Sequence, residues 1–372
     1  MKVLFVFGTR PEAIKLCPVI RHMLSRGREF DVKVCVTAQH RLLLDQVLQV
    51  FQVVPDYDLD VMLPSQSLFQ STAGIISRLE PILAMVRPEV LMVQGDTTST
   101  FCGALAGFYA RIPVGHVEAG LRTRDRLRPF PEELNRVMTT RLASIHFAPT
   151  QEAAENLKAE AVPEKSIFIT GNTVIDAVRF VARQLDEGAL MPDHHLVLEP
   201  SKRLIVVTAH RRETCGQPMA RICRAVAVIA ARPDVQVIFP VHPNPEVRRT
   251  VNHVLGENPN VILTEPLPYV GFLDLLRSAY LLLTDSGGIQ EEASALGKPV
   301  LVLRAATERH EAVAAESAQL VGTDETDIVK TATLLLDGSG RHSRMARVRN
   351  LYGDGNASRR IAAGLLDWRL QC

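Results

Sequence analysis

The chain alternates short apolar runs with segments of helical periodicity, and this alternation restricts its fold more than any other feature. Residues 3–7 are all apolar, which is typical of a strand buried on both faces of a sheet. Gly8 and Pro11 follow, and proline is favoured in the first turn of a helix. Apolar residues then recur at helical spacing as far as Leu24. Repeats of this strand–helix unit indicate a parallel sheet.

The same pattern continues along the chain and starts again after a break. Strands are predicted at residues 32–37, 90–94, 113–117 and 144–148, and later at 204–208, 235–239, 261–264, 280–284 and 299–303. Helices are predicted at residues 41–51, 68–86, 97–109, 132–142, 219–231, 245–255, 271–277 and 289–296. Gly171-Asn172-Thr173 interrupts the pattern, and residues 188–203 have little periodicity.

The two halves open alike. Residues 3–12 read VLFVFGTRPE and residues 204–213 read LIVVTAHRRE, each a strand that runs into a basic loop ending in Glu. We therefore predict an α/β fold of two Rossmann-like domains that face a central cleft, where a ligand binds. The predicted domains are residues 1–170 and 171–355, and the amphipathic segment 356–372 is expected to pack back on the first.

Composition argues against several classes of partner. The net charge is +1 and aromatic residues make up 5% of the chain, so a general grip on nucleic acid or an anionic membrane is not expected. The six cysteines form no CxxC pair, and several lie inside apolar runs, which indicates buried thiols in a reducing compartment. No apolar run is long enough for a membrane span or a signal peptide. We expect a cytoplasmic protein.

Acidic side chains gather at the ends of predicted elements between residues 94 and 136. Asp96 follows one predicted strand, Glu118 follows the next, and Glu132 opens a helix after Pro-Phe-Pro. Ligands of open α/β sheets bind outside the carboxyl ends of the strands, so these carboxylates are expected to converge there and to transfer protons. The alternative is that Asp96 and Glu132 only cap helices. Several arginines crowd between them: Arg122, Arg124, Arg126 and Arg128.

Two helix starts are suited to an anionic ligand. Arg10 ends the first strand and Lys15 lies about one turn into the helix that follows. In the second half a turn follows the predicted strand 280–284, and its glycines let the backbone approach a phosphate. The residues of this second site are Ser286, Gly287, Gly288 and Glu292. The carboxylate of Glu292 is suited to accept hydrogen bonds from ribose hydroxyls. No Lys-Ser/Thr follows the glycines, so this is not a Walker P-loop.

Three further residues follow predicted strands of the second half. Arg309 could bind a diphosphate through two of its guanidinium nitrogens, or pair with a neighbouring Glu. His210 has cationic neighbours and could neutralise a leaving phosphate or act as an acid; His242 follows the next strand, and either could be only a packed histidine. The spacing of the histidines matches no metal-ligand motif, so no metal is expected.

These motifs together resemble the non-hydrolysing UDP-N-acetylglucosamine 2-epimerase family. The matching stretches are GTRPEAIK (8–15), AQHR (38–41), LDQVL (44–48), QGDTTST (94–100), GHVEAGLRT (115–123), PFPEELNR (129–136), TGNTVIDA (170–177), TAHRRE (208–213), PVHPNP (240–245), LTDSGGIQEEA (283–293) and TERHEAV (307–313). The resemblance covers nearly the whole chain. It implies the GT-B-like glycosyltransferase fold with UDP held between the domains, no cofactor or metal, a homodimer, and interconversion of UDP-GlcNAc and UDP-ManNAc.

The resemblance also implies roles for the residues. UDP is eliminated across C1–C2 to leave 2-acetamidoglucal and is then re-added, with a proton delivered to the other face. Asp96, Glu118 and Glu132 are the proton-handling positions, in an order that stays open. The departing diphosphate is stabilised by Arg10, Lys15, His210 and Arg309. Ser286, Gly287, Gly288 and Glu292 hold phosphate and ribose, and Phe272 packs near the uracil.

Other activities fit the same residues. A hydrolysing relative would release free ManNAc and UDP, and a glycosyltransferase of this fold would pass the sugar to an acceptor. A non-catalytic sensor of nucleotide sugars would not need the three carboxylates. The sugar could also be a variant such as a 3-acetamido uronate.

Many bacterial members of the family that the chain resembles need a second UDP-GlcNAc as activator. Gln39 and His242 are retained from that activator site. Leu42 and Ser65, however, stand where the resemblance implies polar and arginine contacts. The sequence therefore predicts turnover without an activator; the alternative is that nearby arginines such as Arg124 or Arg126 replace the lost contacts.

Overall fold

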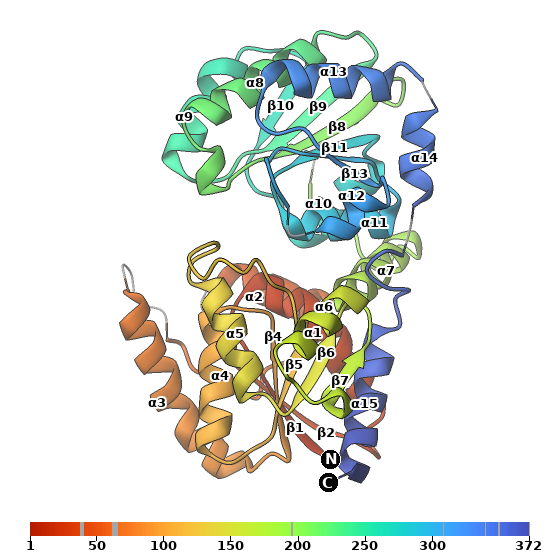
Figure 1. Ribbon diagram of the computed structural model, residues 1–372. Coiled ribbons are helices and arrows are strands. Elements are labelled where there is room, and N and C mark those ends of the chain that lie inside the picture. Colours follow the sequence, from red (N-terminus) through yellow and green to blue (C-terminus); the bar gives the residue numbers. More distant parts are fainter. Residues whose placement is uncertain are drawn as a thin grey trace. The chain divides into compact units, whose positions relative to one another are not determined.

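The computed structural model describes residues 1–37, 41–61, 66–194, 196–307, 309–338, 340–348 and 350–371. The chain folds into two compact units. The first unit holds Met1–Phe180 and Tyr352–Cys372, and the second holds Val181–Leu351. The units part within helix α7 (Thr173–Asp186), later than Gly171, where the sequence pattern breaks. Each unit is a parallel sheet with alternating helices, so the predicted α/β fold of two Rossmann-like domains is confirmed (Figure 1).

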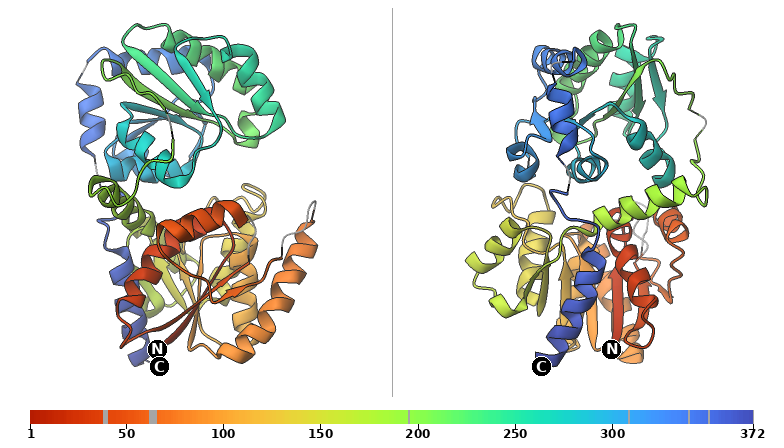
Figure 2. Two further views of the ribbon diagram at one scale, coloured as in Figure 1. Left: turned by 180° about the vertical axis from the view of Figure 1, so that it is seen from behind. Right: turned by 90° about the vertical axis from the view of Figure 1, so that its right-hand side faces the viewer.

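A seven-stranded parallel sheet forms the centre of the first unit, in the order β3-β2-β1-β4-β5-β6-β7. Its strands are β1 (Lys2–Phe7), β2 (Asp31–Val36), β3 (Tyr57–Asp58), β4 (Val90–Gln94), β5 (Val114–Val117), β6 (Ile145–Ala148) and β7 (Ile167–Ile169). The other helices are α1 (Arg10–Leu24), α2 (Arg41–Val50), α3 (Leu68–Val86), α4 (Thr98–Tyr109), α5 (Glu132–Leu142) and α6 (Gln151–Ala159). Helices α1 and α2 pack together on one face of the sheet, and α3, α4 and α5 pack on the other (Figures 1 and 2).

The first strand and helix show why the sequence folds in this way. Every residue of the apolar run that begins at Val3 is fully buried in β1, between β2 and β4. Thr9, two residues after the end of β1, caps α1, because its side chain accepts from the N–H of Glu12 while the Glu12 carboxylate accepts from the N–H of Thr9. Pro11 lies in the first turn of the helix. This turn places Arg10 at the carboxyl edge of the sheet.

A six-stranded parallel sheet forms the second unit, in the order β10-β9-β8-β11-β12-β13. Its strands are β8 (Arg203–Thr208), β9 (Val235–Pro240), β10 (Val261–Thr264), β11 (Leu281–Thr284), β12 (Val300–Val302) and β13 (Ala318–Leu320). Its helices are α8 (Gln217–Ala230), α9 (Pro245–Leu255), α10 (Tyr269–Ser278), α11 (Gly287–Leu296), α12 (His310–Ala314), α13 (Glu325–Leu336) and α14 (Arg341–Arg347). Helix α8 packs between α9 and α13 over a core of buried aliphatic side chains.

The last helix, α15 (Ala357–Gln371), belongs to the first unit and packs against α1 and β6 (Figure 2). A Cβ atom on Gly364 would lie 3.0 Å from the ring of Phe168 and 3.2 Å from that of Phe147, so a glycine allows this close approach. The carboxylate of Asp176 caps α15 by accepting from the N–H groups of Ala357 at 3.2 Å and Ser358 at 2.9 Å.

The described part of the chain contains no helix that is both long and apolar enough to cross a membrane.

Candidate active site

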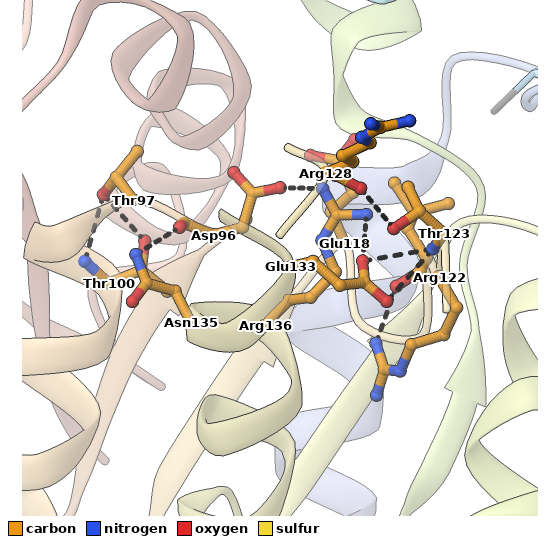
Figure 3. Close-up of polar contacts among 12 residues, drawn as sticks. Asp96, Thr97, Thr100, Glu118, Arg122, Thr123, Arg128, Glu133, Asn135 and Arg136 are labelled. Carbon is orange, nitrogen blue, oxygen red and sulfur yellow. Dashed lines mark hydrogen bonds and ion pairs between the residues drawn. The ribbon is translucent and has the colours of Figure 1, made fainter. Parts of the chain in front are cut away.

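Asp96 and Glu118 lie at the carboxyl ends of two neighbouring strands, as the sequence predicted. Strands β4 and β5 pair in parallel with Gln94 opposite Val117, so the residues that follow them emerge at one edge (Figure 3). A Cβ atom on Gly95 would lie 3.9 Å from Oε2 of Glu118, which shows how close the two turns are. Glu118 itself has a φ of 64°, a conformation that is uncommon for a residue other than glycine and typical of functional sites.

Glu118 is buried among donors. Nζ of Lys15 lies 2.6 Å from Oε1 and 2.7 Å from Oε2 of its carboxylate. The side-chain amides of Gln94 and Asn172 also donate to this carboxylate, the latter at 3.3 Å. A cation and two amides around one carboxylate form the kind of charge-assisted set that holds an ionised group in a fixed orientation. The ammonium group of Lys15, which the sequence assigned to a diphosphate, therefore contacts Glu118 in the structure.

Asp96 forms an ion pair with Arg136, a residue of α5 (Figure 3). Asn135, next to it on the same helix, donates from Nδ2 to the backbone oxygen of Asp96 at 3.0 Å. Arg136 also lies 3.2 Å from Oε2 of Glu133, measured from Nη1. Helix α5 therefore positions Asp96 through both its side chain and its backbone.

Glu132 is the first residue of α5 and Glu12 lies in the first turn of α1. Oε2 of Glu132 is buried and has no hydrogen-bond partner among the residues that the structure describes.

Glu12 has the opposite environment. Its carboxylate accepts from the hydroxyls of Thr97 at 2.7 Å and Thr100 at 3.0 Å, and from the backbone N–H of Gly8 at 3.0 Å. Burial raises the pKa of Glu12, and these donors oppose that rise. Glu12 thus links the start of α1, where Arg10 lies, to the start of α4, which follows Asp96.

The arginines between the carboxylates have separate partners. Arg122 pairs with Glu160 at 2.6 Å and donates to the hydroxyl of Thr140 at 2.9 Å. The side chain of Arg124 donates to Asn156 at 3.3 Å, and the side chain of Arg128 is 88% exposed. Arg122, Arg124 and Arg126 line one open pocket with Glu133 and Glu160.

In the second unit, the turn after β11 opens α11. Ser286 is the N-cap and Gly287 and Gly288 are the first residues of the helix, which begins two residues earlier than the sequence pattern predicted. The Ser286 side chain makes no capping hydrogen bond. A helix start of this kind presents backbone N–H groups to an anion. Glu292, one turn further, is buried, and Phe272 is half-buried on α10, which contacts α11.

Arg309 precedes α12, and its guanidinium group is held by the next helix in space. Nε of Arg309 lies 2.6 Å from Oε1 of Glu291, a residue of α11, and both side chains are buried. The arginine is therefore fixed beside the helix that begins at Gly287.

His210 follows β8 and lies against a buried aspartate. Nδ1 of His210 is 3.6 Å from Oδ1 of Asp285, whose Oδ2 accepts from the N–H groups of His210 and Arg211, each at 2.8 Å, and from the hydroxyl of Thr214 at 2.8 Å. Burial lowers the pKa of His210, and the Asp285 carboxylate opposes this shift. The ring of His242 stacks on that of His210 with centroids 5.4 Å apart. The sequence had left the role of His242 open.

Several partners of these residues were missed in the sequence. Glu133 and Arg136 could have been found, because they are three residues apart on a predicted helix that carries Glu132. Asn172 and Asp285 come from distant elements and gave no such signal. Gln39 lies outside the described residues. Within the described ranges, no three His, Cys, Asp or Glu side chains are grouped so that they could hold a metal ion.

Two Rossmann-like domains with charged groups at strand ends and helix starts define the class of nucleotide-binding α/β proteins. Comparison with known proteins places the chain within that class. The profile of the UDP-N-acetylglucosamine 2-epimerase family matches residues 22–366. The UDP-N-acetylglucosamine 2-epimerase of Escherichia coli K12 is 52% identical over 375 residues, which cover 100% of both chains.

Solved structures agree with this assignment. A UDP-GlcNAc 2-epimerase from Neisseria meningitidis, solved with bound UDP-GlcNAc, aligns with a TM-score of 0.93 and 45% identity over 99% of this chain and 100% of that one. A Staphylococcus aureus protein, MnaA, solved with UDP, aligns with a TM-score of 0.89 and 40% identity over 100% of this chain and 97% of that one. The chain therefore belongs to the UDP-N-acetylglucosamine 2-epimerase family, and its fold is GT-B-like.

Proposed function

We propose that the chain catalyses the reversible, non-hydrolysing epimerisation of UDP-GlcNAc to UDP-ManNAc. The observation that carries this proposal is the pair of carboxylates at adjacent strand ends, Asp96 and Glu118, with Glu132 at the start of α5. Membership of the epimerase family supports the substrate, since the Neisseria meningitidis relative was solved with UDP-GlcNAc.

The chemistry requires groups that both take and deliver protons. The proton at C2 is lost as the bond from C1 to the diphosphate oxygen breaks, which leaves a C1–C2 double bond in 2-acetamidoglucal and free UDP. UDP then adds back to C1 while a proton reaches C2 from the opposite face. Two faces need two proton-transfer groups, for which Asp96, Glu118 and Glu132 are the three candidates. Neither the elimination nor the re-addition is an oxidation or a reduction, so this sequence of steps needs no redox cofactor.

The remaining candidate residues would bind the nucleotide. Arg10 and His210 stabilise the departing diphosphate, and Lys15 and Arg309 contribute charge from within their ion pairs with Glu118 and Glu291. The helix start of α11 and Glu292 hold phosphate and ribose, and Phe272 packs near the uracil. The helix start supports this assignment because its backbone N–H groups suit a phosphate.

The test is turnover in D2O. The enzyme is incubated with UDP-GlcNAc and the sugar is followed by NMR, and UDP-ManNAc with deuterium at C2 is expected. UDP-ManNAc that keeps its C2 hydrogen contradicts the mechanism. Free ManNAc indicates the hydrolysing reaction, and turnover only with an added acceptor indicates a glycosyltransferase. Asp96→Asn, Glu118→Gln and Glu132→Gln are expected to lower the rate by about 10²–10⁴-fold while UDP binding persists.

We further propose that the protein is a cytoplasmic homodimer. Helices α3 and α4 pack side by side and expose large apolar side chains, with Phe69 88%, Met85 64%, Phe108 59% and Tyr109 68% exposed. Exposed apolar side chains of this size are typical of an interface. The buried free thiols fit a reducing compartment. Sedimentation of the wild type and of Phe108→Glu tests the dimer, because the variant is expected to sediment as a monomer.

A further inference from the structure

The carboxylate of Asp96 forms an ion pair with an arginine whose side chain is buried in the first unit. Nη2 of Arg136 forms a close ion pair with Oδ2 of Asp96 (Figure 3). The side chain of Asp96 is 29% exposed, whereas that of Arg136 is 9% exposed. A ligand can therefore reach the carboxylate, while the group that orients it stays beneath the surface.

Glu133 in turn holds the arginine. Its Oε2 lies 3.2 Å from Nη1 of Arg136, one helical turn away on α5, and its side chain is 3% exposed. Removing one partner of a buried ion pair leaves an uncompensated charge, so Glu133 and Asp96 together balance Arg136. Among the described residues, neither Nε nor Nη1 of Arg136 has a hydrogen-bond partner, so Glu133 holds the guanidinium group by charge, as an ion pair. The two carboxylates are therefore what fix the guanidinium group.

The same glutamate anchors the loop that leads to α5. Oε1 of Glu133 accepts from the N–H groups of Arg124 at 2.9 Å and Thr123 at 3.1 Å. The hydroxyl of Thr123 donates to the backbone oxygen of Arg128 at 2.6 Å, which closes the loop on itself (Figure 3). One carboxylate thus sets both the arginine that contacts Asp96 and the segment that precedes Glu132.

We propose that Arg136 and Glu133 are a positioning pair for the epimerase reaction. Arg136 holds the Asp96 carboxylate in the orientation needed for proton transfer, and Glu133 acts through Arg136. This inference rests on the proposed function of Asp96. Neither residue needs to touch the sugar, because the effect comes from placing the reacting oxygen. Displacing a reacting group by about 1 Å can cost about 10²-fold in rate.

The test compares rate with affinity in the full chain. Arg136→Met is expected to lower kcat by about 10²-fold while KM and the affinity for UDP stay at the wild-type level. Added guanidinium ion is expected to restore part of the lost kcat, which a purely structural role would not allow. Arg141→Met is the matched control, since Arg141 lies on the same helix and donates instead to the backbone oxygen of Glu160 at 2.9 Å. The kcat of Arg141→Met is expected to match that of the wild type.

Glu133→Gln tests the second half of the pair. This variant keeps a side-chain oxygen that can accept from the N–H groups of Thr123 and Arg124, and it loses only the charge that pairs with Arg136. The double variant Glu133→Gln, Arg136→Met is therefore expected to be no slower than Arg136→Met alone, because the charge of the glutamate works through the arginine. If Arg136→Met does not fold, Arg136→Lys replaces it; this variant keeps the charge but loses the planar fork, and it too is expected to lose kcat.

Three results overturn the positioning pair and leave the proposed function standing. They are wild-type kcat in a folded Arg136 variant, a loss of UDP affinity as large as the loss of kcat, and additive losses in the double variant. The absence of C2 deuteration by the wild type overturns the proposed function, and the positioning pair with it.

Discussion

The ammonium group of Lys15 lies within 2.7 Å of both carboxylate oxygens of Glu118, although the two residues are 103 positions apart in the chain. The side chain of Lys15 is 12% exposed and that of Glu118 is 6% exposed. An ion pair this deep costs much to break, because the remaining charge is left without compensation. It also ties α1 to the carboxyl end of β5, where the proton-transfer groups are proposed.

Lys15→Met is therefore expected to lower both turnover and stability. Breaking a buried ion pair costs about 3–5 kcal/mol of unfolding free energy, which urea unfolding would measure. Lys33→Met is the control, since Lys33 pairs with Asp56 at 2.9 Å but both side chains are about one-third exposed, at 35% and 31%. That exposed pair contributes about 0–1 kcal/mol. Equal losses in the two variants would contradict the structural assignment of Lys15.

Asp285→Asn tests how His210 is held. Asp285 is fully buried, and one of its oxygens accepts three hydrogen bonds from the segment that carries His210. Asparagine has the same shape but no charge, and its NH2 group can face the N–H and hydroxyl groups that donate to Asp285 in the wild type. The expected result is slower formation of the glucal and a loss of about 1–3 kcal/mol in stability.

The matched control for this variant is Asp274→Asn. Oδ2 of Asp274 lies 3.5 Å from Nε2 of His194 in the same unit. The variant therefore removes an Asp–His contact that is not part of the candidate site. Glucal formation at the wild-type rate is expected in this control. The same rate in Asp285→Asn would show that Asp285 does not act on His210.

Most of the fold was predictable because buried parallel strands are continuous apolar runs. The run that begins at Val3 became β1 with every residue buried, and the run at Val90–Gln94 became β4 unchanged. The strands that were missed are β3, β7 and β13, which lie at the edges of the two sheets. They have only two or three residues each and are partly exposed, so their sequences (YD, IFI and AQL) are too short to stand out as apolar runs. Their strand conformation comes from pairing with a neighbour.

The candidate site was predictable in its positions but not in its partners. Asp96 and Glu118 stand at strand ends, which a sequence reveals once the strands are identified. The pairing of Lys15 with Glu118, and of Asp285 with the loop of His210, depends on which strands become neighbours. The periodicity of a helix does not reveal which strands pair. The pairing of Glu133 with Arg136 could be predicted, because residues three apart on one helix lie side by side.

Leu42 and Ser65 lead to a prediction about regulation. By resemblance to the family, these positions contact a second UDP-GlcNAc, yet leucine cannot hydrogen-bond and serine cannot offer a bidentate charge. Each lost charged hydrogen bond costs about 1.5–3 kcal/mol. Purified UDP-ManNAc is therefore expected to be converted without added UDP-GlcNAc and without a lag. Ser65 lies outside the described residues, so the prediction depends on the sequence alone.

The control for this regulation restores the missing groups. The double variant Leu42→Gln, Ser65→Arg is expected to gain stimulation by UDP-GlcNAc in the conversion of UDP-ManNAc. A sigmoidal dependence on UDP-GlcNAc in the wild type would show instead that an activator site functions without these two side chains.

His116 is a fully buried residue of β5. One ring nitrogen, Nε2, is 2.7 Å from the backbone oxygen of Gly95, the residue before Asp96. Burial lowers the pKa of His116 to about 3, and the hydrogen bond to Gly95 only partly opposes this. Below about pH 6.5 the unfolded chain binds a proton on this histidine, whereas the folded chain does not until near pH 3.

The stability that His116 contributes is therefore present above about pH 6.5 and is lost as the pH falls towards 3. His116→Gln removes this titration while keeping a side-chain N–H group for Gly95, so its urea-unfolding free energy is expected to fall less steeply with decreasing pH. His253→Gln is the control, because it makes the same substitution at an exposed residue of α9, outside the core. Parallel pH curves for the wild type and His116→Gln would show that the folded protein accommodates a charged imidazole in β5.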